Sequence, residues 1–163
     1  MELAAVDQTL DHETRLGEGD HDALRLWLRL LTCTNLIEGA IRADLRSEFE
    51  VTLPRFDLMA QLFRHAGGLK MGVLSQRLMV TGGNVTGITN QLEKEGLVTR
   101  ATDSLDRRSF VIKLTAAGRR AFARMAVRHE EWVAELFGGL TESERTELFR
   151  LLGRLKTTLN TPG

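Results

Sequence analysis

The spacing of apolar residues changes once along this chain of 163 residues, and this change constrains the fold more than any other feature. Between residues 54 and 95, apolar side chains recur every three or four positions in three short runs, a period typical of amphipathic helices. Residues 97–102 and 109–114 instead alternate apolar and polar side chains, which is typical of strands. The sequence therefore predicts three short helices followed by a β-hairpin.

Proline and glycine mark the limits of the short helices. Pro54 suits the first turn of the first helix, because its missing N–H is not needed there, and Gly67-Gly68 ends that helix. The second helix is expected over residues 70–78. The third, over residues 82–95, is followed by Gly96, where a left-handed C-cap is favoured. The residues expected to face inward from this third helix are Val85, Ile88 and Leu92.

Long helical patterns flank this central region. Residues 22–49 carry two apolar stripes, which predicts burial against two surfaces, such as the protein's own core and another subunit. Thr115 is expected to cap a helix that reaches Phe137. The run from Thr141 to Glu144 has the S/T-x-x-E form of a capping box and opens a last helix with an apolar leucine face. The predicted fold class is mainly α with a small β-hairpin.

The formal net charge is zero, which by itself argues against a nucleic-acid-binding protein. The distribution along the chain is uneven, however. Residues 1–22 contain seven acidic residues and one basic residue, whereas residues 70–114 contain seven basic residues and four acidic ones. The predicted hairpin and the helices before it are therefore locally positive.

Several functional classes find no support in the sequence. No apolar run is long enough to cross a membrane and no secretory signal is recognisable, so a cytoplasmic location is expected. The single cysteine, Cys33, excludes an intramolecular disulfide. The four histidines form no metal-ligand pair and no catalytic triad is apparent, so we expect neither an enzyme nor a metal or other cofactor.

The order of three helices and a hairpin between long helices is that of a winged helix-turn-helix, and here the chain resembles the MarR family. The resemblance extends over about residues 23–159 and depends on an ordered set of motifs, none of which is specific alone. These motifs are Leu74-Ser75-Gln76-Arg77-Leu78-Met79-Val80-Thr81, Asn84-Val85-Thr86, Leu92-Glu93-Lys94-Glu95-Gly96-Leu97-Val98-Thr99-Arg100, Asp106-Arg107-Arg108-Ser109 and Leu114-Thr115-Ala116-Ala117-Gly118.

The resemblance implies a dimeric repressor or activator that binds operator DNA and whose first and last helices form the dimer interface. The expected organisation is one compact domain with four segments. These are an acidic arm over residues 1–21, a dimerisation helix over 22–53, a winged helix-turn-helix DNA-binding region over 54–115 and C-terminal dimerisation helices over 116–160.

The outward side of the third helix has the chemistry needed to recognise base edges. Asn90 and Gln91 can pair bidentately with adenine, and Thr86 or Thr89 can contact a thymine methyl group. The glycines of this helix permit close approach to DNA, although they are also compatible with a loose helix start. The residues expected to contact DNA from this helix and its cap are Thr81, Gly82, Gly83, Asn84, Thr86, Gly87, Thr89, Asn90 and Gln91.

That helix lacks positive charge before Lys94, so affinity for phosphates must come from elsewhere. Many members of the family have arginine or lysine where Gly83 or Gly87 stands here. Either arginine of the hairpin turn can enter the minor groove while Asp106 braces the other, and the sequence does not distinguish them. The residues expected to contact DNA outside the third helix are Ser75, Arg77, Arg100, Asp106, Arg107 and Arg108, with Lys70 as a further source of charge.

The family resemblance also implies a small-molecule effector. The run from Leu24 to Ile41 and the segment from Val80 to Thr89 are similar to a branch that regulates hydroxycinnamate catabolism and responds to aromatic acyl-CoA thioesters. The aromatic residues concerned are equally compatible with ordinary core packing. The residues expected to line the effector site are Trp27, Leu31, Asn35, Arg42, Arg46, Phe56, Met59, Phe63 and His65.

Two alternatives remain open from the sequence. Some relatives sense peroxide through one cysteine of the first helix, but they use tyrosines to hold it and this chain has none. Cys33 also lies on an apolar stripe, which favours buried packing. The other alternative is an interaction module whose winged helix no longer binds DNA.

Overall fold

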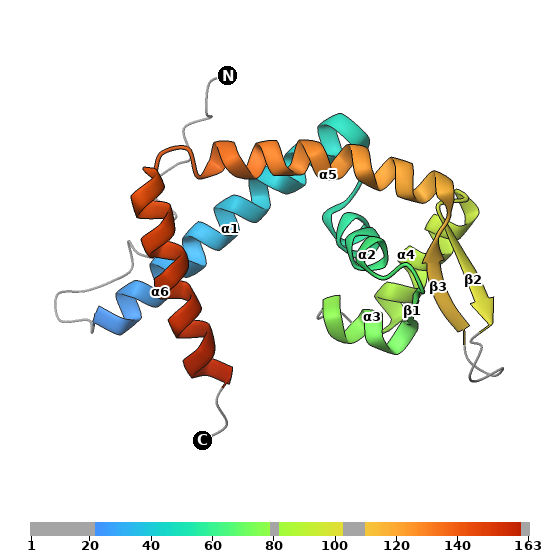
Figure 1. The fold of residues 1–163 in the computed structure, drawn as a ribbon, viewed down its shortest axis with the longest axis horizontal. Coiled ribbons are helices and arrows are strands. Elements are labelled where there is room, and N and C mark those ends of the chain that lie inside the picture. The colour runs from blue at the N-terminus through green and yellow to red at the C-terminus, as the bar shows by residue number, and fades with distance from the viewer. Residues whose placement is uncertain (1–21, 79–81, 103–109, 161–163) are drawn as a thin grey trace. The chain divides into compact units, whose positions relative to one another are not determined.

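The protein is mainly helical with a small antiparallel sheet, as the sequence predicted (Figure 1). The computed structural model describes residues 22–78, 82–102 and 110–160. Contacts divide the chain into two units, Met1–Thr52 and Leu53–Gly163, where the sequence predicted one compact domain. Each unit is described below by itself.

The first unit contains one long helix, α1 (Asp22–Phe49), over the residues that the apolar stripes predicted. Only Ile41 and Leu45 of this helix are buried. The helix ends where Glu50 adopts a left-handed backbone conformation, with a φ of 56°. The large apolar side chains that α1 leaves exposed are Leu24, Leu26, Trp27 and Leu36.

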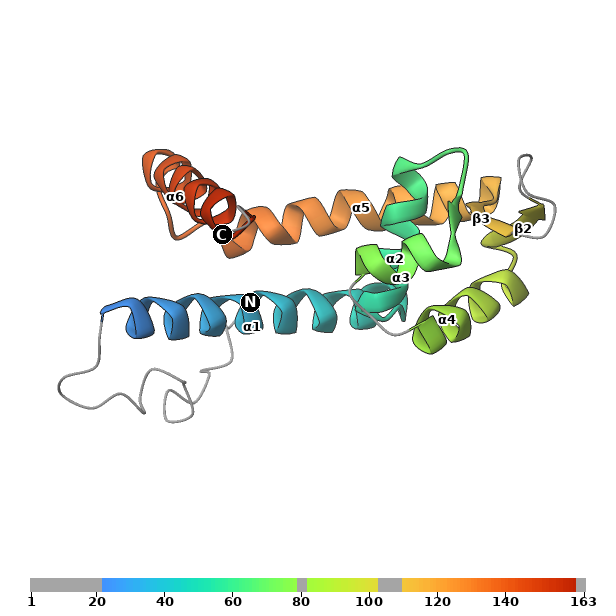
Figure 2. The same cartoon turned by 90° about the horizontal axis from the view of Figure 1, so that it is seen from below.

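The second unit contains five helices and three strands among the described residues. Their bounds are α2 (Leu53–Arg64), β1 (Leu69–Lys70), α3 (Met71–Leu78), α4 (Gly82–Lys94), β2 (Val98–Thr102), β3 (Phe110–Leu114), α5 (Ala116–Leu136) and α6 (Glu142–Asn160). Figure 2 shows how α4 leads into the sheet and how α5 continues from it.

The sheet has the order β1-β3-β2, with antiparallel pairing throughout. Strands β2 and β3 form the predicted hairpin, in which Val98 pairs with Leu114 and Arg100 with Ile112. Strand β1 was not predicted, because its two residues are too few to show an alternating pattern. It adds one edge to the hairpin and connects α2 to α3.

The core of the second unit is formed by one face of each helix from α2 to α5 and by the inner side of the sheet. On α2 the buried residues include Leu62, whereas the adjacent Phe63 remains 38% exposed. The buried apolar residues of this unit are Phe56, Leu58, Met59, Leu62, Leu69, Leu74, Val85, Ile88, Leu92, Val98, Ile112, Leu114, Phe122, Met125 and Trp132.

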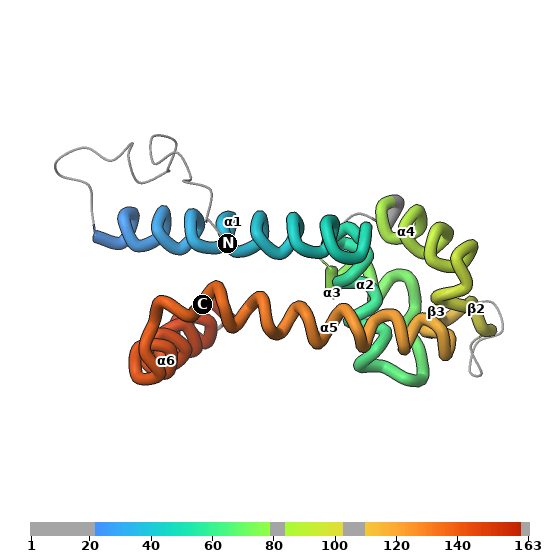
Figure 3. The backbone as a smooth tube through the Cα atoms, turned by 90° about the horizontal axis from the view of Figure 1, so that it is seen from above, coloured from blue at the N-terminus to red at the C-terminus, as the bar shows by residue number. Residues whose placement is uncertain are grey.

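Aromatic rings connect α2 to α5, whose path is traced in Figure 3. The ring of Phe122 lies with its centroid 4.9 Å from that of Phe63 and 5.3 Å from that of Phe56. The ring of Phe56 in turn lies 4.8 Å from the imidazole of His129. Partial burial lowers the pKa of His129 from its ordinary value of 6.5, because the charged imidazolium loses hydration there.

This environment predicts a loss of stability in mild acid. The folded protein resists protonation of His129, so the unfolded chain binds more protons as the pH falls through about 6.5, and the folding equilibrium shifts toward unfolding. In thermal unfolding at pH 7.5 and pH 5.5, His129→Gln should lose less stability between the two values than the wild type. Equal losses in both proteins would contradict this role of His129.

Three predicted helix ends are confirmed. Gly96, which follows α4, has a φ of 70°. Thr115 caps α5 and its side-chain oxygen accepts a hydrogen bond from the backbone N–H of Gly118, 3.0 Å away. In the capping box of α6, the Glu144 carboxylate accepts hydrogen bonds from the backbone N–H and the hydroxyl of Thr141, and these bonds lower the pKa of Glu144.

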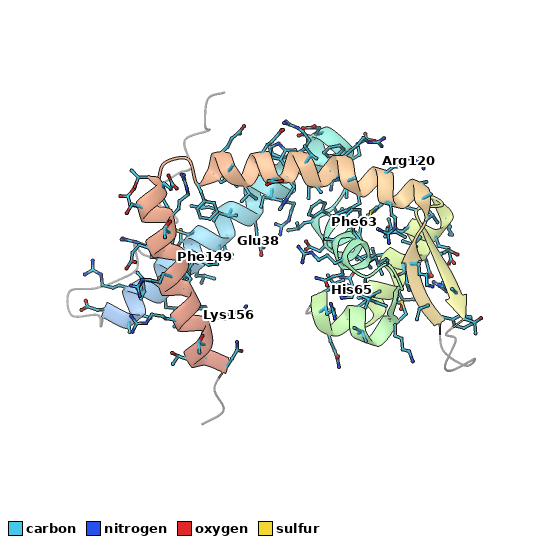
Figure 4. The ribbon with its side chains drawn as sticks, in the orientation of Figure 1. Glu38, Phe63, His65, Arg120, Phe149 and Lys156 are labelled. Carbon is cyan, nitrogen blue, oxygen red and sulfur yellow. The ribbon has the colours of Figure 1, made fainter. Side chains whose placement is uncertain are left out.

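Helix α6 exposes every one of its residues within the single chain. Its exposed apolar residues recur every three or four positions and form a continuous face, termed here the α6 leucine face. Figure 4 shows Phe149 on this helix, and Phe149 is 82% exposed beside that face. The residues of the α6 leucine face are Leu148, Leu151, Leu152, Leu155 and Leu159.

Candidate nucleic-acid interface

Helix α4 has one buried side and one exposed polar side. Val85 and Leu92 are fully buried and Ile88 is 8% exposed, which confirms the predicted inward set. The opposite side exposes amides, a hydroxyl and a glycine without a side chain. A Cβ atom added at Gly87 would meet no other atom within 4 Å, so this position is open to a large ligand. The exposed residues are Asn84, Thr86, Gly87, Asn90 and Gln91.

Thr89 does not belong to this exposed surface, so its predicted contact with a thymine methyl group was wrong. The residue is fully buried, and its hydroxyl donates a hydrogen bond of 2.8 Å to the backbone carbonyl of Val85. A buried hydroxyl is tolerated when it is hydrogen-bonded in this way. Thr89 therefore stabilises the packing of α4 and cannot contact a base.

Two side chains of α4 interact with an arginine of β2. The Arg100 Nη2 donates a hydrogen bond to the Asn90 side-chain oxygen. The Arg100 Nε lies 3.3 Å from the Glu93 carboxylate, and both side chains of this ion pair are more than one-third exposed. Asn90 and Glu93 are three residues apart and therefore occupy the same face of the helix. The spacing was visible in the sequence, but Glu93 was not predicted as part of the site.

A second arginine, Arg77 of α3, is held by residues of α2. Its Nη1 lies 2.9 Å from Nε2 of His65 and 3.4 Å from the side-chain oxygen of Gln61. The other ring nitrogen of His65, Nδ1, lies 2.7 Å from the Gln61 backbone carbonyl. A carbonyl only accepts and a guanidinium only donates, so Nδ1 carries the hydrogen and Nε2 accepts from Arg77. Figure 4 shows His65 near the end of α2.

Backbone contacts connect the end of α4 to the start of α5, at a place termed here the α4–α5 junction. The Thr115 hydroxyl donates a hydrogen bond of 2.7 Å to the Gly96 carbonyl, and the Thr115 N–H donates one of 3.0 Å to the Leu97 carbonyl. Gly118 is buried there, and a Cβ atom added to it would lie 1.9 Å from the Leu97 carbonyl oxygen. Only glycine fits so close to the Leu97 carbonyl.

An ion pair with α2 also supports this end of α4. Arg55 of α2 pairs with Glu95, which directly follows α4, and the Arg55 side chain is only 17% exposed. Sequence reasoning identified neither Arg55 nor Gly118 as residues that position the site, because both act through contacts between distant segments. The Thr-Ala-Ala-Gly sequence before and including Gly118 was the only available signal.

The structure places some of the predicted DNA contacts and not others. Ser75 is half-buried on α3, and Arg77 and Arg100 are exposed. Gly82 and Gly83 belong to the first turn of α4. The other predicted contacts lie outside the described residues; they are Thr81, Asp106, Arg107 and Arg108.

The residues predicted to line an effector site are divided between the two units. On α1, Trp27 is 54% exposed, Leu31 is half-buried, and Asn35, Arg42 and Arg46 are exposed. On α2 the structure favours the core alternative for two residues, since Phe56 is 5% and Met59 is 1% exposed. Phe63 remains accessible, with the Arg119 guanidinium 5.6 Å from the centre of its ring.

Other candidate chemistry finds little support in the described part of the chain. Cys33 is exposed within the single chain, so the core of its own chain does not bury it. Across residues 22–78, 82–102 and 110–160, no cluster of three or more potential metal ligands occurs. Within the same residues, no helix is long and apolar enough to span a membrane.

Comparison with known proteins agrees with this architecture. The MarR family model matches residues 51–110. The chain is 28% identical over 159 residues to the transcriptional activatory protein BadR of Rhodopseudomonas palustris, covering 93% of this chain and 87% of that protein. It is 32% identical over 115 residues to an uncharacterised HTH-type transcriptional regulator of Bacillus subtilis, YkoM, covering 71% of this chain and 73% of the relative.

Solved structures show the same fold. A MarR family transcriptional regulator from Silicibacter pomeroyi is 34% identical and superposes with a TM-score of 0.73, covering 86% of this chain and 100% of that chain. Wild-type MarR from E. coli in its apo form superposes with a TM-score of 0.72 at 22% identity, covering 80% of this chain and 96% of that chain.

Proposed function

Because this chain belongs to the MarR family of transcriptional regulators, we propose that it binds a pseudo-palindromic operator as a homodimer and represses transcription in the cytoplasm. Helix α4 enters the major groove, and the β2–β3 hairpin lies over the adjacent backbone. The observation that carries this proposal is the exposed side of α4, where uncharged amides surround the open position at Gly87.

The homodimer is supported by the apolar surface that a single chain leaves exposed. The five residues of the α6 leucine face are between 37% and 75% exposed. A continuous apolar face of this kind usually marks an interface. In a dimer of two-fold symmetry, the two α4 helices bind half-sites about one turn of DNA apart.

Affinity and base recognition reside in different residues. Lys94 is the basic residue of the last turn of α4, and the exposed residues before it, from Asn84 to Gln91, are uncharged, so α4 contributes little to phosphate binding. We assign phosphate contacts to Arg77 and to the hairpin arginines Arg107 and Arg108. Arginine suits this role because its fixed fork of donors matches a phosphate group.

This division can be tested on an operator obtained by in vitro selection. Arg107→Ala and Arg108→Ala should each weaken binding to all sequences and reduce the slope of log affinity against log salt by about one. Arg124→Ala, an exposed substitution on α5, serves as the control and should leave the slope unchanged. If the hairpin variants bind as tightly as the wild type with the same salt slope, the assignment is wrong.

The effector is proposed to be an aromatic acid or its acyl-CoA thioester. Support comes from the second unit, where the ring of Phe63 remains accessible and the Arg119 guanidinium lies 5.6 Å from its centre. Such groups suit a ligand with an aromatic ring and negative charge. Titration of the operator complex with p-coumarate and with p-coumaroyl-CoA tests the proposal, and release by the free acid alone would exclude the thioester.

The alternatives are not favoured. The relatives described above are named as transcriptional regulators, which does not support an interaction module without DNA binding. A redox switch would depend on Cys33 as a lone exposed thiol, and no second observation on the described residues connects it with oxidation.

A further inference from the structure

We propose that Arg100 is a positioning residue that determines how Asn90 recognises DNA, and that it does not serve mainly as a phosphate contact. This inference rests on the proposed function and specifies the base chemistry of the same site. The evidence is the contact of one guanidinium group on β2 with two side chains on the exposed side of α4.

The Asn90 amide is held in one orientation by Arg100. A side-chain amide has an oxygen that accepts and a nitrogen that donates, whereas a guanidinium only donates. The hydrogen bond from Arg100 therefore fixes the Asn90 oxygen on the side of β2. The two N–H groups of Asn90 remain as the donors that this exposed side chain offers to a ligand.

The Arg100 guanidinium is itself held in place by two side chains of α4. The Arg100 Nη2 contacts Asn90 while its Nε pairs with Glu93, so the guanidinium is held at two points. Because the group is planar and its donors have fixed directions, the two contacts define its orientation. Arg100 is also in register with the buried Ile112, which fixes its backbone within the sheet.

The charge of Arg100 is paired with an opposite charge on α4. The positive charge of Arg100 is balanced by the negative charge of Glu93 at 3.3 Å, so the pair adds no net charge to the surface. A neutral pair releases few counterions on DNA binding, in contrast to a phosphate contact. Arg100 therefore contributes little to affinity through its charge, and its contacts give it the role of orienting Asn90.

The base preference follows from the donors of Asn90. In the major groove, purine N7, guanine O6 and thymine O4 are acceptors, whereas the cytosine amino group is a donor. Asn90 oriented by Arg100 should favour a base with an acceptor at the facing position and reject cytosine there. In bidentate pairing with adenine, by contrast, the amide would use both its oxygen and its nitrogen for the base and would have no partner within the protein.

The experiment uses the full-length protein and an operator obtained by in vitro selection. The base pair that Asn90 contacts is identified as the one at which Asn90→Ala loses preference. The wild type should discriminate there by about tenfold. Arg100→Lys keeps the charge but cannot make both contacts, so discrimination should fall to about twofold while affinity for the mismatched operator changes by less than about twofold.

Two further variants separate positioning from other roles. Adding Arg100→Lys to Asn90→Ala should cause no further loss of discrimination, because both changes remove the same interaction. Arg124→Lys, an arginine on the exposed surface of α5, is the matched control and should behave as the wild type. If Arg100→Lys retains the full base preference, or if it weakens all operators equally and lowers the salt slope, the proposal is overturned.

A measurement without DNA distinguishes this inference from the proposed function. The side-chain amide of Asn90 should give an NMR signal that shifts in Arg100→Lys and not in Arg124→Lys. An unshifted signal would overturn the positioning role of Arg100. If instead the signal shifts in Arg100→Lys but the wild-type protein binds all DNA sequences equally, the proposed function is overturned, and base recognition by Asn90 with it.

Discussion

Replacing Leu152 by glutamate is expected to convert the proposed homodimer into monomers and to abolish tight operator binding. Leu152 lies at the centre of the α6 leucine face and is 39% exposed in the single chain. Burying the exposed part of Leu152 contributes a fraction of the roughly 1.5–3 kcal/mol of a whole leucine, and a glutamate carboxylate buried in its place adds the larger cost of its desolvation. A two-fold interface contains each residue twice, so the loss is doubled and the dimer dissociation constant should rise at least about 100-fold.

Sedimentation velocity over a range of concentrations measures this change, and circular dichroism verifies that the helices remain. Arg154→Glu provides the matched control, because residue 154 is exposed on the opposite side of α6 and should leave the dimer intact. A Leu152→Glu protein that remains dimeric at the same concentrations as the wild type would show that the α6 leucine face is not the dimer interface.

Gly118→Ala is expected to destabilise the fold by about 3 kcal/mol or more. Alanine normally stabilises a helix relative to glycine by about 1 kcal/mol. At this position, however, the added Cβ atom would lie 1.9 Å from the Leu97 carbonyl oxygen and 3.1 Å from the Leu114 side chain. The α4–α5 junction would have to open, which also breaks the hydrogen bonds of Thr115 to Gly96 and Leu97.

Chemical denaturation of the two proteins measures the difference in the free energy of unfolding. Gly72→Ala is the control, since Gly72 also lies in the first turn of a helix and a Cβ atom there would meet nothing within 4 Å. Its effect should be neutral or stabilising by less than about 1 kcal/mol. If Gly118→Ala and the wild type have similar free energies of unfolding, the α4–α5 junction can accommodate the added Cβ atom without loss of stability.

The features that the sequence predicted well are local ones. The positions of Val85, Ile88 and Leu92 follow from helical spacing, and their burial was predicted correctly. The capping box that begins at Thr141 and the left-handed conformation of Gly96 follow equally from residue type and position. In each case a few neighbouring residues determine the conformation.

The features that the sequence did not predict depend on contacts between distant segments. Thr89 is polar, and only the structure shows that its hydroxyl is satisfied by the Val85 carbonyl inside the core. Phe63 and Leu62 are adjacent apolar residues, so spacing alone did not decide which one is buried. The contact of Arg100 with Asn90 joins a strand to a helix, and residue type gives no register for such a pair.

The α4–α5 junction has a consequence for how such a regulator can evolve. Its hydrogen bonds use the backbone carbonyls of Gly96 and Leu97, which every residue type provides, and it demands a particular side chain only at Thr115 and Gly118. Substitutions on the exposed side of α4 therefore leave the support of the helix unchanged. A lineage can acquire a new operator by changing a few surface residues, without first accumulating compensating mutations in the core.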